Sequence, residues 1–412
     1  MKKMLLILIA LSFLVFLFLN LKSPLRIEGD GVFYYSYLHS AFFDHDFNFR
    51  NQLEHFSSYD YFSRKFLAEN KLTDIGKTPN AYALGVAVMW IPFFLLAHLL
   101  TWIFRLPLDG YSYFYVFFLN FSAWLFGILA LILNYKNLRK FFNGKISFFS
   151  VLSIWLSTPW IYYQFLAPSM NHMASLFLAS LFLFLSMREW REKKESRLFT
   201  PVAFLMILTR WQNIFFVLFY TPVFLKNKKK ILNILIPVLL FIVSQALIWK
   251  NIYGQYFLIP QGHRFVGYEF HGLYTLFSSD RGLLLWSPVI ILSLVGLVYL
   301  WKRCKFLTAI TILIFLCQWV LNSSLNDLGG GEAFGARRFI ETFPLLIFPL
   351  AAFLERWQKK KIVFFLLLAL ILGNFLLLEN YRLGYIPRNG QFNFFQTNLW
   401  QAAERDINRI TH

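Results

Sequence analysis

The stretch IEGDGVFYYSYLHSAFFDHD, residues 27–46, sets four carboxylates among aromatic residues. It begins a few residues after an apolar run, Met4 to Leu21, that is long enough to cross a bilayer. Tyrosine rings suit the headgroup boundary of a membrane, so Tyr34, Tyr35 and Tyr37 are expected there. Carboxylates at that depth need a structural or chemical reason, and four of them fall in this stretch: Glu28, Asp30, Asp44 and Asp46.

The composition identifies the solvent that surrounds the chain. Of its 412 residues, 58% are hydrophobic and 20% aromatic, and the mean hydropathy is +0.53. These values predict an all-α polytopic membrane protein. The net charge of +19 does not indicate a nucleic-acid partner, because the basic residues occur in short clusters between apolar runs. The two cysteines predict neither a disulfide framework nor a metal cage.

The basic clusters orient the chain. Short loops rich in Lys and Arg stay on the cytoplasmic side of a membrane. The first apolar run follows Lys2 and Lys3 and no A-x-A pattern precedes Pro24, so we expect an uncleaved anchor with its N-terminus inside. Five further clusters are expected inside: Lys136/Arg139/Lys140/Lys145, Arg188/Arg191/Lys193/Lys194/Arg197, Lys226/Lys228/Lys229/Lys230, Lys302/Arg303/Lys305 and Arg356/Lys359/Lys360/Lys361.

These constraints predict a bundle of about eleven transmembrane helices within one domain, residues 1–412. Residues 198–225 have basic ends and are expected to form a hairpin of two short helices with Arg210 near the bend. Residues 81–104 contain Pro92 and are expected to be a broken, juxtamembrane or re-entrant segment. The other crossings are expected at 4–21, 111–134, 146–163, 172–187, 231–249, 282–301, 306–321, 339–354 and 362–378.

The same topology places the largest polar segments outside. The first outer loop, residues 22–80, is expected to contain juxtamembrane helices, and residues 379–412 form an outer tail. The loop carries eight of the 21 acidic residues of the chain, which indicates that the function faces outward. These acids are Glu28, Asp30, Asp44, Asp46, Glu54, Asp60, Glu69 and Asp74.

Several common activities find no support in the sequence. Gly76-Lys77-Thr78 lacks the leading glycine of a P-loop, and the glycines of residues 329–335 miss the dinucleotide-binding spacing. Neither H-E-x-x-H nor G-x-S-x-G occurs, which disfavours metalloproteases and serine hydrolases.

The outside loops also hold arginines, against the usual trend for such loops. The planar fork of arginine is suited to phosphate, and neighbouring glycines allow a backbone to approach a ligand closely. An anionic ligand is therefore expected beside Arg281, Arg337 and Arg338. The other polar candidates along the chain are Asn171 and His172 in SMNH, Arg210, His263 and Arg264 in QGHRF, Asp280, and Glu332.

Taken together, these motifs resemble the integral-membrane glycosyltransferases of the GT-C fold, especially the bacterial branch similar to protein O-mannosyltransferases and the aminoarabinose transferases of lipid A. The residues that carry the resemblance are EGDGVFYY, DHD, PSMNH, Arg210 in LTRWQN, SSDRGLLLWSP and GGGEAFGARRFIETFPLL. Each motif is short, but they cover most of the chain.

The resemblance implies an inverting transfer of a sugar from a polyprenyl-phosphate donor to a hydroxyl of a glycan, lipid or protein acceptor, on the outer face of the cytoplasmic membrane. It implies that Asp30 is the general base. The family more often has an adjacent Asp-Glu pair, so the Glu28-Gly29-Asp30 arrangement leaves open whether Glu28 shares that role. Arg337 and Arg338, with Arg210 or Arg281, are expected to bind the donor phosphate.

The remaining candidates are expected to contact substrate. No cofactor is expected, and a divalent metal is left open because two carboxylates alone do not select one. Membrane lipids are expected partners, and nucleic acid is not. The substrate-contacting candidates are Asp44, Asp46, Asn171, His172, His263, Arg264 and Glu332.

Ordinary structural roles compete with these assignments. Asp30 could cap a helix that starts near Val32, and Asp44 and Asp46 could be solvated loop acids or caps. His172 could be a satisfied interfacial histidine, Arg210 could snorkel, and His263 and Arg264 could be loop residues.

A transporter or flippase for a lipid-linked saccharide is the alternative function, and an O-antigen-type polymerase ranks below it. Transporters place ionisable groups at mid-membrane on broken helices, whereas the acids here fall in an outer loop.

Overall fold

The computed structural model describes residues 2–260, 266–267, 269–394, 397–402 and 404–405, and these residues are predominantly helical. They divide into two compact units, which we call the loop unit (residues 6–130 and 163–263) and the tail unit (residues 1–5, 131–162 and 264–412). Three helices continue from one unit into the other: α1 (Lys2–Asn20), α6 (Tyr113–Leu138) and α8 (Trp160–Phe165).

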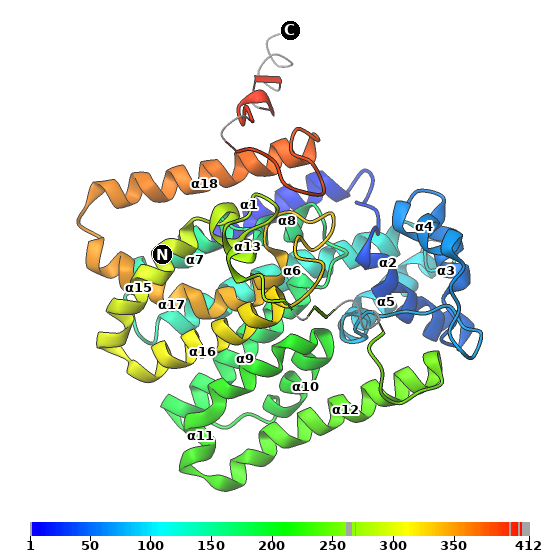
Figure 1. The fold of residues 1–412 in the computed structure, drawn as a ribbon, viewed down its shortest axis with the longest axis horizontal. Helices are drawn as coiled ribbons and strands as arrows, with labels where there is room; N and C mark the ends of the chain where they lie inside the picture. Colours follow the sequence, from blue (N-terminus) through cyan, green and yellow to red (C-terminus); the bar gives the residue numbers. More distant parts are fainter. Residues whose placement is uncertain (1, 261–265, 268, 395–396, 403, 406–412) are drawn as a thin grey trace. The chain divides into compact units, whose positions relative to one another are not determined.

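The loop unit contains the first outer loop and the hairpin predicted around Arg210. Its helices are α1 (Lys2–Asn20), α2 (Asp30–His39), the π-helix η1 (Ser40–Asp44), α3 (Arg50–Ser57), α4 (Tyr61–Glu69), α5 (Gly85–Ile103), α9 (His172–Glu192), α10 (Phe199–Thr209), the 3₁₀-helix η2 (Trp211–Tyr220), α11 (Thr221–Lys226), the 3₁₀-helix η3 (Lys228–Ile231) and α12 (Leu232–Tyr253). In this unit α10 packs against α9 and α12 (Figure 1).

The tail unit contains the glycine-rich loop and the C-terminal segment. Its helices are α7 (Gly144–Leu156), α13 (Gly272–Phe277), α14 (Leu283–Trp286), α15 (Val289–Arg303), α16 (Lys305–Ser323), the 3₁₀-helix η5 (Arg337–Thr342), α17 (Phe343–Trp357) and α18 (Lys361–Arg382). Helices α15 and α17 pack closely, because Gly296 has no side chain to hold off the Pro349 carbonyl. Asn374 of α18 donates to the Leu156 carbonyl at the end of α7 (2.9 Å).

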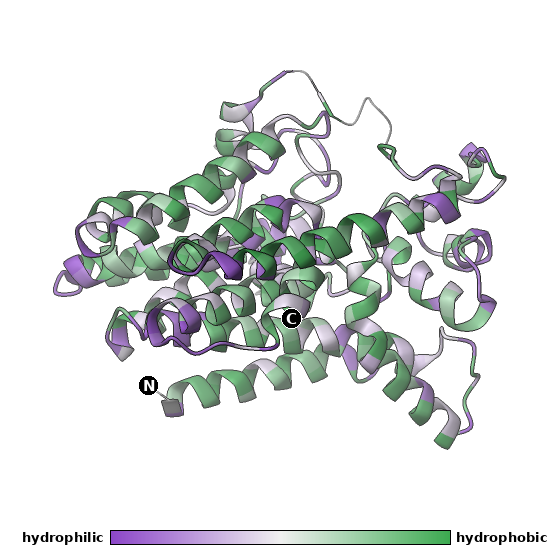
Figure 2. Ribbon diagram, turned by 90° about the horizontal axis from the view of Figure 1, so that it is seen from below, coloured by the Kyte–Doolittle hydropathy of each residue, from purple (hydrophilic) through white to green (hydrophobic). Residues whose placement is uncertain are grey.

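Seven helices are long and apolar enough to cross a membrane, which agrees with a polytopic helical membrane protein. Hydrophobic residues cover most of the length of the long helices, and hydrophilic residues gather at their ends and in the loops (Figure 2). The seven segments are Lys3–Asn20, Gly85–Ile103, Tyr113–Leu138, His172–Glu192, Lys228–Tyr253, Lys305–Ser323 and Lys361–Arg382.

One of these segments corrects a sequence prediction. Residues 81–104 were expected to be broken at Pro92, but α5 is one continuous helix of 19 residues through that proline. Proline removes one backbone donor and bends a helix, yet it does not end the helix when the neighbouring turns remain bonded. Residues 85–103 therefore have the length of a membrane span.

Five expected crossings lack that length. The segment predicted at 146–163 ends as α7 at Leu156, after 13 residues. The segment at 282–301 divides into α14 and α15, and the segment at 339–354 begins in 3₁₀ geometry before the 15-residue α17. The remaining two are the halves of the expected hairpin. The predicted number of about eleven spans is thus larger than the seven helices that meet the length criterion in the described chain.

The hairpin predicted at residues 198–225 is present. Helix α10 ends at Thr209, Arg210 is extended (φ −156°, ψ 112°), and η2 begins at Trp211. The ring of Phe199 at the start of α10 lies 4.2 Å from that of Tyr220 at the end of η2. The chain therefore turns at Arg210 and returns.

Residues 22–80, the predicted outer loop, contain helices α2, η1, α3 and α4, as expected, but the tyrosines of α2 do not lie at a surface. Every residue of α2 from Gly31 to His39 is buried, and Tyr35 has no exposed area. Side chains and backbone from residues 80–82 and 109–111 cover this helix. Since each buried aromatic side chain removes about 150 to 250 Å² from solvent, α2 forms the core of the loop rather than a face for lipid.

Candidate functional site

The backbone at Gly29 fixes the start of α2 and with it Asp30. Gly29 has φ 58° and ψ −132°, a conformation that side chains disfavour. Its N–H donates to Asp60 Oδ1 (2.9 Å). Gly29 holds the N-cap position and no side chain caps this helix, so Asp30 is its first helical residue and not its cap. The positive end of the helix dipole there stabilises the ionised carboxylate.

The Asp30 carboxylate contacts a tyrosine from another part of the loop. Tyr82 Oη donates to Asp30 Oδ1 (3.1 Å), and the Tyr82 ring stacks on that of Phe33 with the centroids 4.8 Å apart. Asn80 donates from its side chain to the Phe33 carbonyl (2.8 Å) and so ties this segment to α2. Asp30 is half-buried.

The loop PSMNH lies against the same glycines. A Cβ on Gly31 would meet Ser169 at 2.5 to 2.8 Å, and Met170 Cε lies 3.6 Å from the corresponding position of Gly29. The loop leads into α9, where His172 is buried beside the Tyr163 ring (4.4 Å between centroids). Sequence motifs more than 130 residues apart thus meet at Gly31.

Arg210 completes this arrangement. Its Nη1 donates to His172 Nδ1 (3.0 Å), so the neutral imidazole carries its proton on Nε2. Gly85 at the start of α5 packs directly on the backbone of Leu208 and Thr209, the two residues before Arg210. The contacts Asp30–Tyr82, Gly85–Thr209, Arg210–His172 and Ser169–Gly31 form a closed circuit, which we call the acid–arginine ring.

Glu28 lies beside a different group. Its charge and, above all, burial raise the pKa of Tyr59 to about 12, and Arg26 lies over the Tyr59 ring (4.9 Å to the centroid). The Glu28 side chain is exposed. Its expected share in catalysis stays a prediction.

Asp44 and Asp46 have local partners in the loop. Asp44 accepts from Gln52 and from Asn51 Nδ2 (3.0 Å). Asp46 accepts from Ser40 Oγ (2.7 Å) and from the Asn48 N–H (3.0 Å). These contacts fit a role in shaping the turn after η1. Asn171, at 7% exposure, makes no side-chain cap at the start of α9.

Arg281, in the tail unit, has a different environment from Arg210. Its Nε donates to the Ala333 carbonyl (2.8 Å), Nη1 to Asp280 and the Gly390 carbonyl (3.2 Å), and Nη2 to the carbonyls of Pro387 (3.0 Å) and Arg388. A guanidinium has five N–H donors, and these five contacts use them all. Arg281 is 3% exposed, so it is suited to hold the C-terminal segment rather than a phosphate.

Arg337 and Arg338 follow the glycine-rich loop. Arg338 Nη2 pairs with Asp327 Oδ2 (2.8 Å), and Gly330 and Gly331 have φ near 70°. A cavity of about 20 Å³ lies among Gly329, Gly330, Arg337 and Arg338, which has room for about one water molecule. The expected phosphate role of these two arginines stays a prediction.

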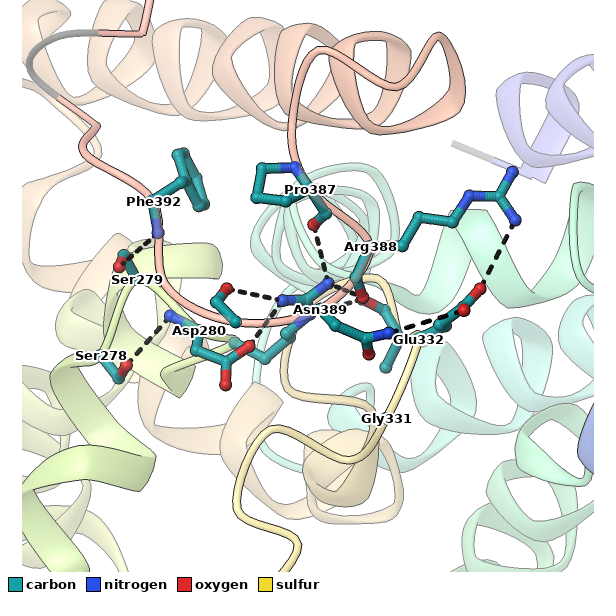
Figure 3. A network of polar contacts seen from close by, with 12 residues as sticks. Ser278, Ser279, Asp280, Gly331, Glu332, Pro387, Arg388, Asn389 and Phe392 are labelled. Atoms are coloured by element: carbon teal, nitrogen blue, oxygen red, sulfur yellow. Dashed lines mark hydrogen bonds and ion pairs between the residues drawn. The ribbon is translucent and has the colours of Figure 1, made fainter.

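The remaining candidates divide between the tail and the undescribed residues. Glu332 Oε2 lies 3.7 Å from Arg388 Nη1, and Glu332 Oε1 accepts from Asn389 Nδ2 (3.5 Å) (Figure 3). His263 and Arg264 lie outside the described residues. Among the residues that the structure describes, no group of three or more His, Cys, Asp or Glu is placed to hold a metal ion.

Sequence reasoning gave no role at the site to three residues that lie around Asp30 and its glycines: Asp60, Tyr82 and Ser169. Asp60 is 4% exposed and caps α4 through Ser63 N (2.7 Å), and an Asp three residues before a Ser at a helix start is a visible signal. Nothing in the sequence marks Tyr82 as a partner of Asp30.

Comparison with models of protein families, with curated proteins and with solved structures found no match to this chain.

Proposed function

We propose that the chain is an inverting glycosyltransferase that uses a polyprenyl-phosphate sugar as donor. The observation that supports this proposal most is the acid–arginine ring. It holds a half-buried carboxylate at the start of a buried helix, in one circuit of contacts with a guanidinium at a helix break. A carboxylate and a guanidinium in one site suit a reaction that removes a proton and releases a phosphate.

In the proposed reaction, Asp30 accepts the proton of the acceptor hydroxyl. The oxygen forms a bond to the anomeric carbon from the side opposite the lipid phosphate, and the bond from that carbon to the phosphate oxygen breaks. The electron pair leaves on the phosphate oxygen, and the configuration inverts. Asp30 needs to take the proton only late, as the oxocarbenium-like centre forms, which is how paired acids act in glycoside hydrolysis.

Arg210 is the proposed partner of the donor phosphate. Charge-assisted bonds from arginine stabilise the leaving phosphate without a proton donor. The extended backbone at Arg210 ends α10, and the His172 imidazole fixes one edge of the guanidinium. Arg337 and Arg338 stay candidates for a second phosphate contact.

Tyr82 and Asp60 are proposed to position Asp30. Tyr82 orients one carboxylate oxygen, and Asp60 holds the Gly29 N–H. The glycines on either side of Asp30 let Ser169 and Met170 of the PSMNH loop approach the backbone closely.

The experiment that tests this function is a transfer assay with purified protein and a panel of polyprenyl-phosphate sugars, followed by analysis of the anomeric configuration of the product. Formation of an inverted glycoside supports the proposal. If the protein moves lipid-linked saccharide across vesicles and forms no glycosidic bond, it is a transporter or flippase, and the proposal fails.

A further inference from the structure

A second site lies in the tail unit, at the C-terminal ends of α15 and α17. A cavity of about 650 Å³ opens there, a volume within the range of ligand pockets. Its lining is Tyr299, Lys302, Arg303, Ala352, Glu355, Arg356, Trp357, Gln358, Lys359 and Lys360. None of these residues belongs to the acid–arginine ring.

The charge of this cavity is largely uncompensated. Of its five basic side chains, Arg303 pairs with Glu355 and also covers the Phe142 ring (4.5 Å to the centroid). Across the described chain, the other four basic residues have no carboxylate within ion-pair distance: Lys302, Arg356, Lys359 and Lys360. Basic residues near helix C-termini offset the helix dipole, but that role alone does not require four of them around one cavity.

An aromatic wall accompanies the charge. Trp357 is 37% exposed, and its Nε1 donates to Tyr299 Oη (3.3 Å). Tryptophan and tyrosine are the residues that prefer the depth of lipid headgroups. The cavity also lies between two of the basic clusters predicted to be cytoplasmic, so it combines positive charge, interfacial aromatics and an open volume.

We propose that this cavity binds the phosphate of an anionic lipid headgroup in the cytoplasmic leaflet. Clusters of Lys and Arg beside a membrane surface attract anionic headgroups, and each basic side chain near the surface strengthens that binding. The phosphate takes the place of the missing carboxylates between Lys302, Arg356, Lys359 and Lys360, while Trp357 lies along the glycerol and the upper acyl chains. The proposal does not depend on the glycosyltransferase assignment.

The test measures the binding of short-chain phosphatidylglycerol to the purified full-length protein in detergent, with short-chain phosphatidylcholine and inorganic phosphate as comparison ligands. We expect saturable binding of phosphatidylglycerol, much weaker binding of phosphatidylcholine, and no displacement by an equal concentration of inorganic phosphate. Comparable binding of phosphatidylcholine overturns the proposal. Displacement by inorganic phosphate at equal concentration also overturns it, because the ligand is then free phosphate.

A pair of matched triple variants locates the binding. Replacing Arg356, Lys359 and Lys360 by Gln should weaken phosphatidylglycerol binding about tenfold to a hundredfold. Replacing Lys226, Lys228 and Lys229 by Gln removes the same charge from exposed positions in the loop unit and should leave binding within about threefold. Equal losses in both variants would show a non-specific charge effect and overturn the site.

A second readout does not depend on charge. Brominated phosphatidylglycerol quenches tryptophan at short range, so quenching should fall in Trp357→Phe and stay unchanged in Trp102→Phe, which removes an exposed tryptophan of α5. Unchanged quenching in Trp357→Phe would place the lipid elsewhere.

Discussion

Arg210 and Arg281 both lie shortly after the end of a helix, α10 and α13 respectively, but the contacts of their side chains differ. In the acid–arginine ring, Arg210 is half-buried and bonds the His172 imidazole. In the tail unit, Arg281 is buried and all five of its N–H groups donate to Asp280 and to four backbone carbonyls.

The two arginines differ in the acceptors to which their guanidinium groups donate. Arg281 donates to the carbonyls of Pro387, Arg388 and Gly390 and so holds the returning C-terminal segment in place. Arg210 donates to a ring nitrogen of the His172 side chain. An arginine in a predicted outside loop can therefore serve to hold the chain itself, as Arg281 does, rather than an anionic ligand. The predictions below test this contrast.

The largest effect is expected at the acid of the ring. Asp30→Asn keeps the shape of the side chain but cannot accept a proton, so turnover in the transfer assay should fall by about 100-fold to 10,000-fold. Donor binding should persist. Glu28→Gln should lose less, and a larger loss in Asp44→Asn or Asp46→Asn than in Asp30→Asn would move the base to the DHD triplet.

A large effect on stability is expected at Arg281. Arg281→Met removes the donor to Asp280 and to four backbone carbonyls, and breaking a buried pair in this way costs about 3 to 5 kcal/mol. Thermal unfolding in detergent, followed by intrinsic fluorescence, should show a clearly lower Tm. The control is Arg382→Met, which removes an exposed pair with Glu379 and should change stability by about 1 kcal/mol or less. Equal Tm values for the two variants would contradict the structural role of Arg281.

At Arg210 we expect the reverse of Arg281: a loss of donor binding with little loss of stability. Arg210→Gln should weaken donor binding by about 1.5 to 3 kcal/mol, the worth of one charge-assisted hydrogen bond, while the Tm falls far less than in Arg281→Met. Lysine should rescue poorly, because it lacks the planar fork. Arg197→Gln, at an exposed position before α10, is the control. Normal donor affinity in Arg210→Gln would place the phosphate site elsewhere.

A smaller effect on catalysis is expected at Asp60. Asp60→Asn weakens the bond to the Gly29 N–H, worth about 1 kcal/mol, and should lower kcat several-fold with little change in KM. The pH dependence of kcat should keep its shape, because Asp60 holds Asp30 in place and does not take the proton. A shifted pH profile would show that Asp60 acts in the proton transfer itself.

The smallest expected effect is a pH dependence of the stability of residues 22–80, the predicted outer loop. Burial lowers the pKa of His39, and bonding to the Asp109 carbonyl and the charges of Asp44 and Asp109 offset this only in part. The unfolded chain then binds the proton more readily, with a pKa near about 6.5, so the loop loses stability as the pH falls below that value.

Hydrogen exchange of peptides from residues 30–60 at pH 7.5 and 5.5 measures this loss. Burial also lowers the pKa of His55, which stacks on Tyr111. The double variant His39→Gln/His55→Gln should therefore exchange at a rate that depends less on pH after correction for intrinsic exchange. An unchanged pH dependence would assign it to other groups.

The sequence predicted the helical class, the loop helices and the break at Arg210, because apolar periodicity and basic ends are local signals. The prediction of a break at Pro92 was wrong. Whether a helix continues through a proline depends on the hydrogen bonds of the neighbouring turns, which the identity of one residue does not reveal. The prediction for Tyr34, Tyr35 and Tyr37 was also wrong. The residues that bury them, Asn80 and Gly110 among them, are distant in sequence.

The site was predictable to a similar extent. The motifs EGDG and PSMNH were recognised separately, and the structure brings them together at Gly31 and Ser169. The role of Arg281 could not be read from its neighbours, because three of its five acceptors lie more than 100 residues away in the C-terminal segment.

The winding of the chain after Arg210 sets the reach of the hairpin. Helix α10 has 11 residues, which span about 16 Å at 1.5 Å per residue. The ten residues of η2 span about 20 Å in 3₁₀ winding, at about 2.0 Å per residue, but would span only about 15 Å as an α-helix. The 3₁₀ winding thus carries the returning segment about 4 Å farther than the length of α10, although η2 has one residue fewer. Deleting one residue from η2 would draw its end toward Arg210 by about 2 Å, because the length of a helix depends on its rise per residue as well as on its number of residues.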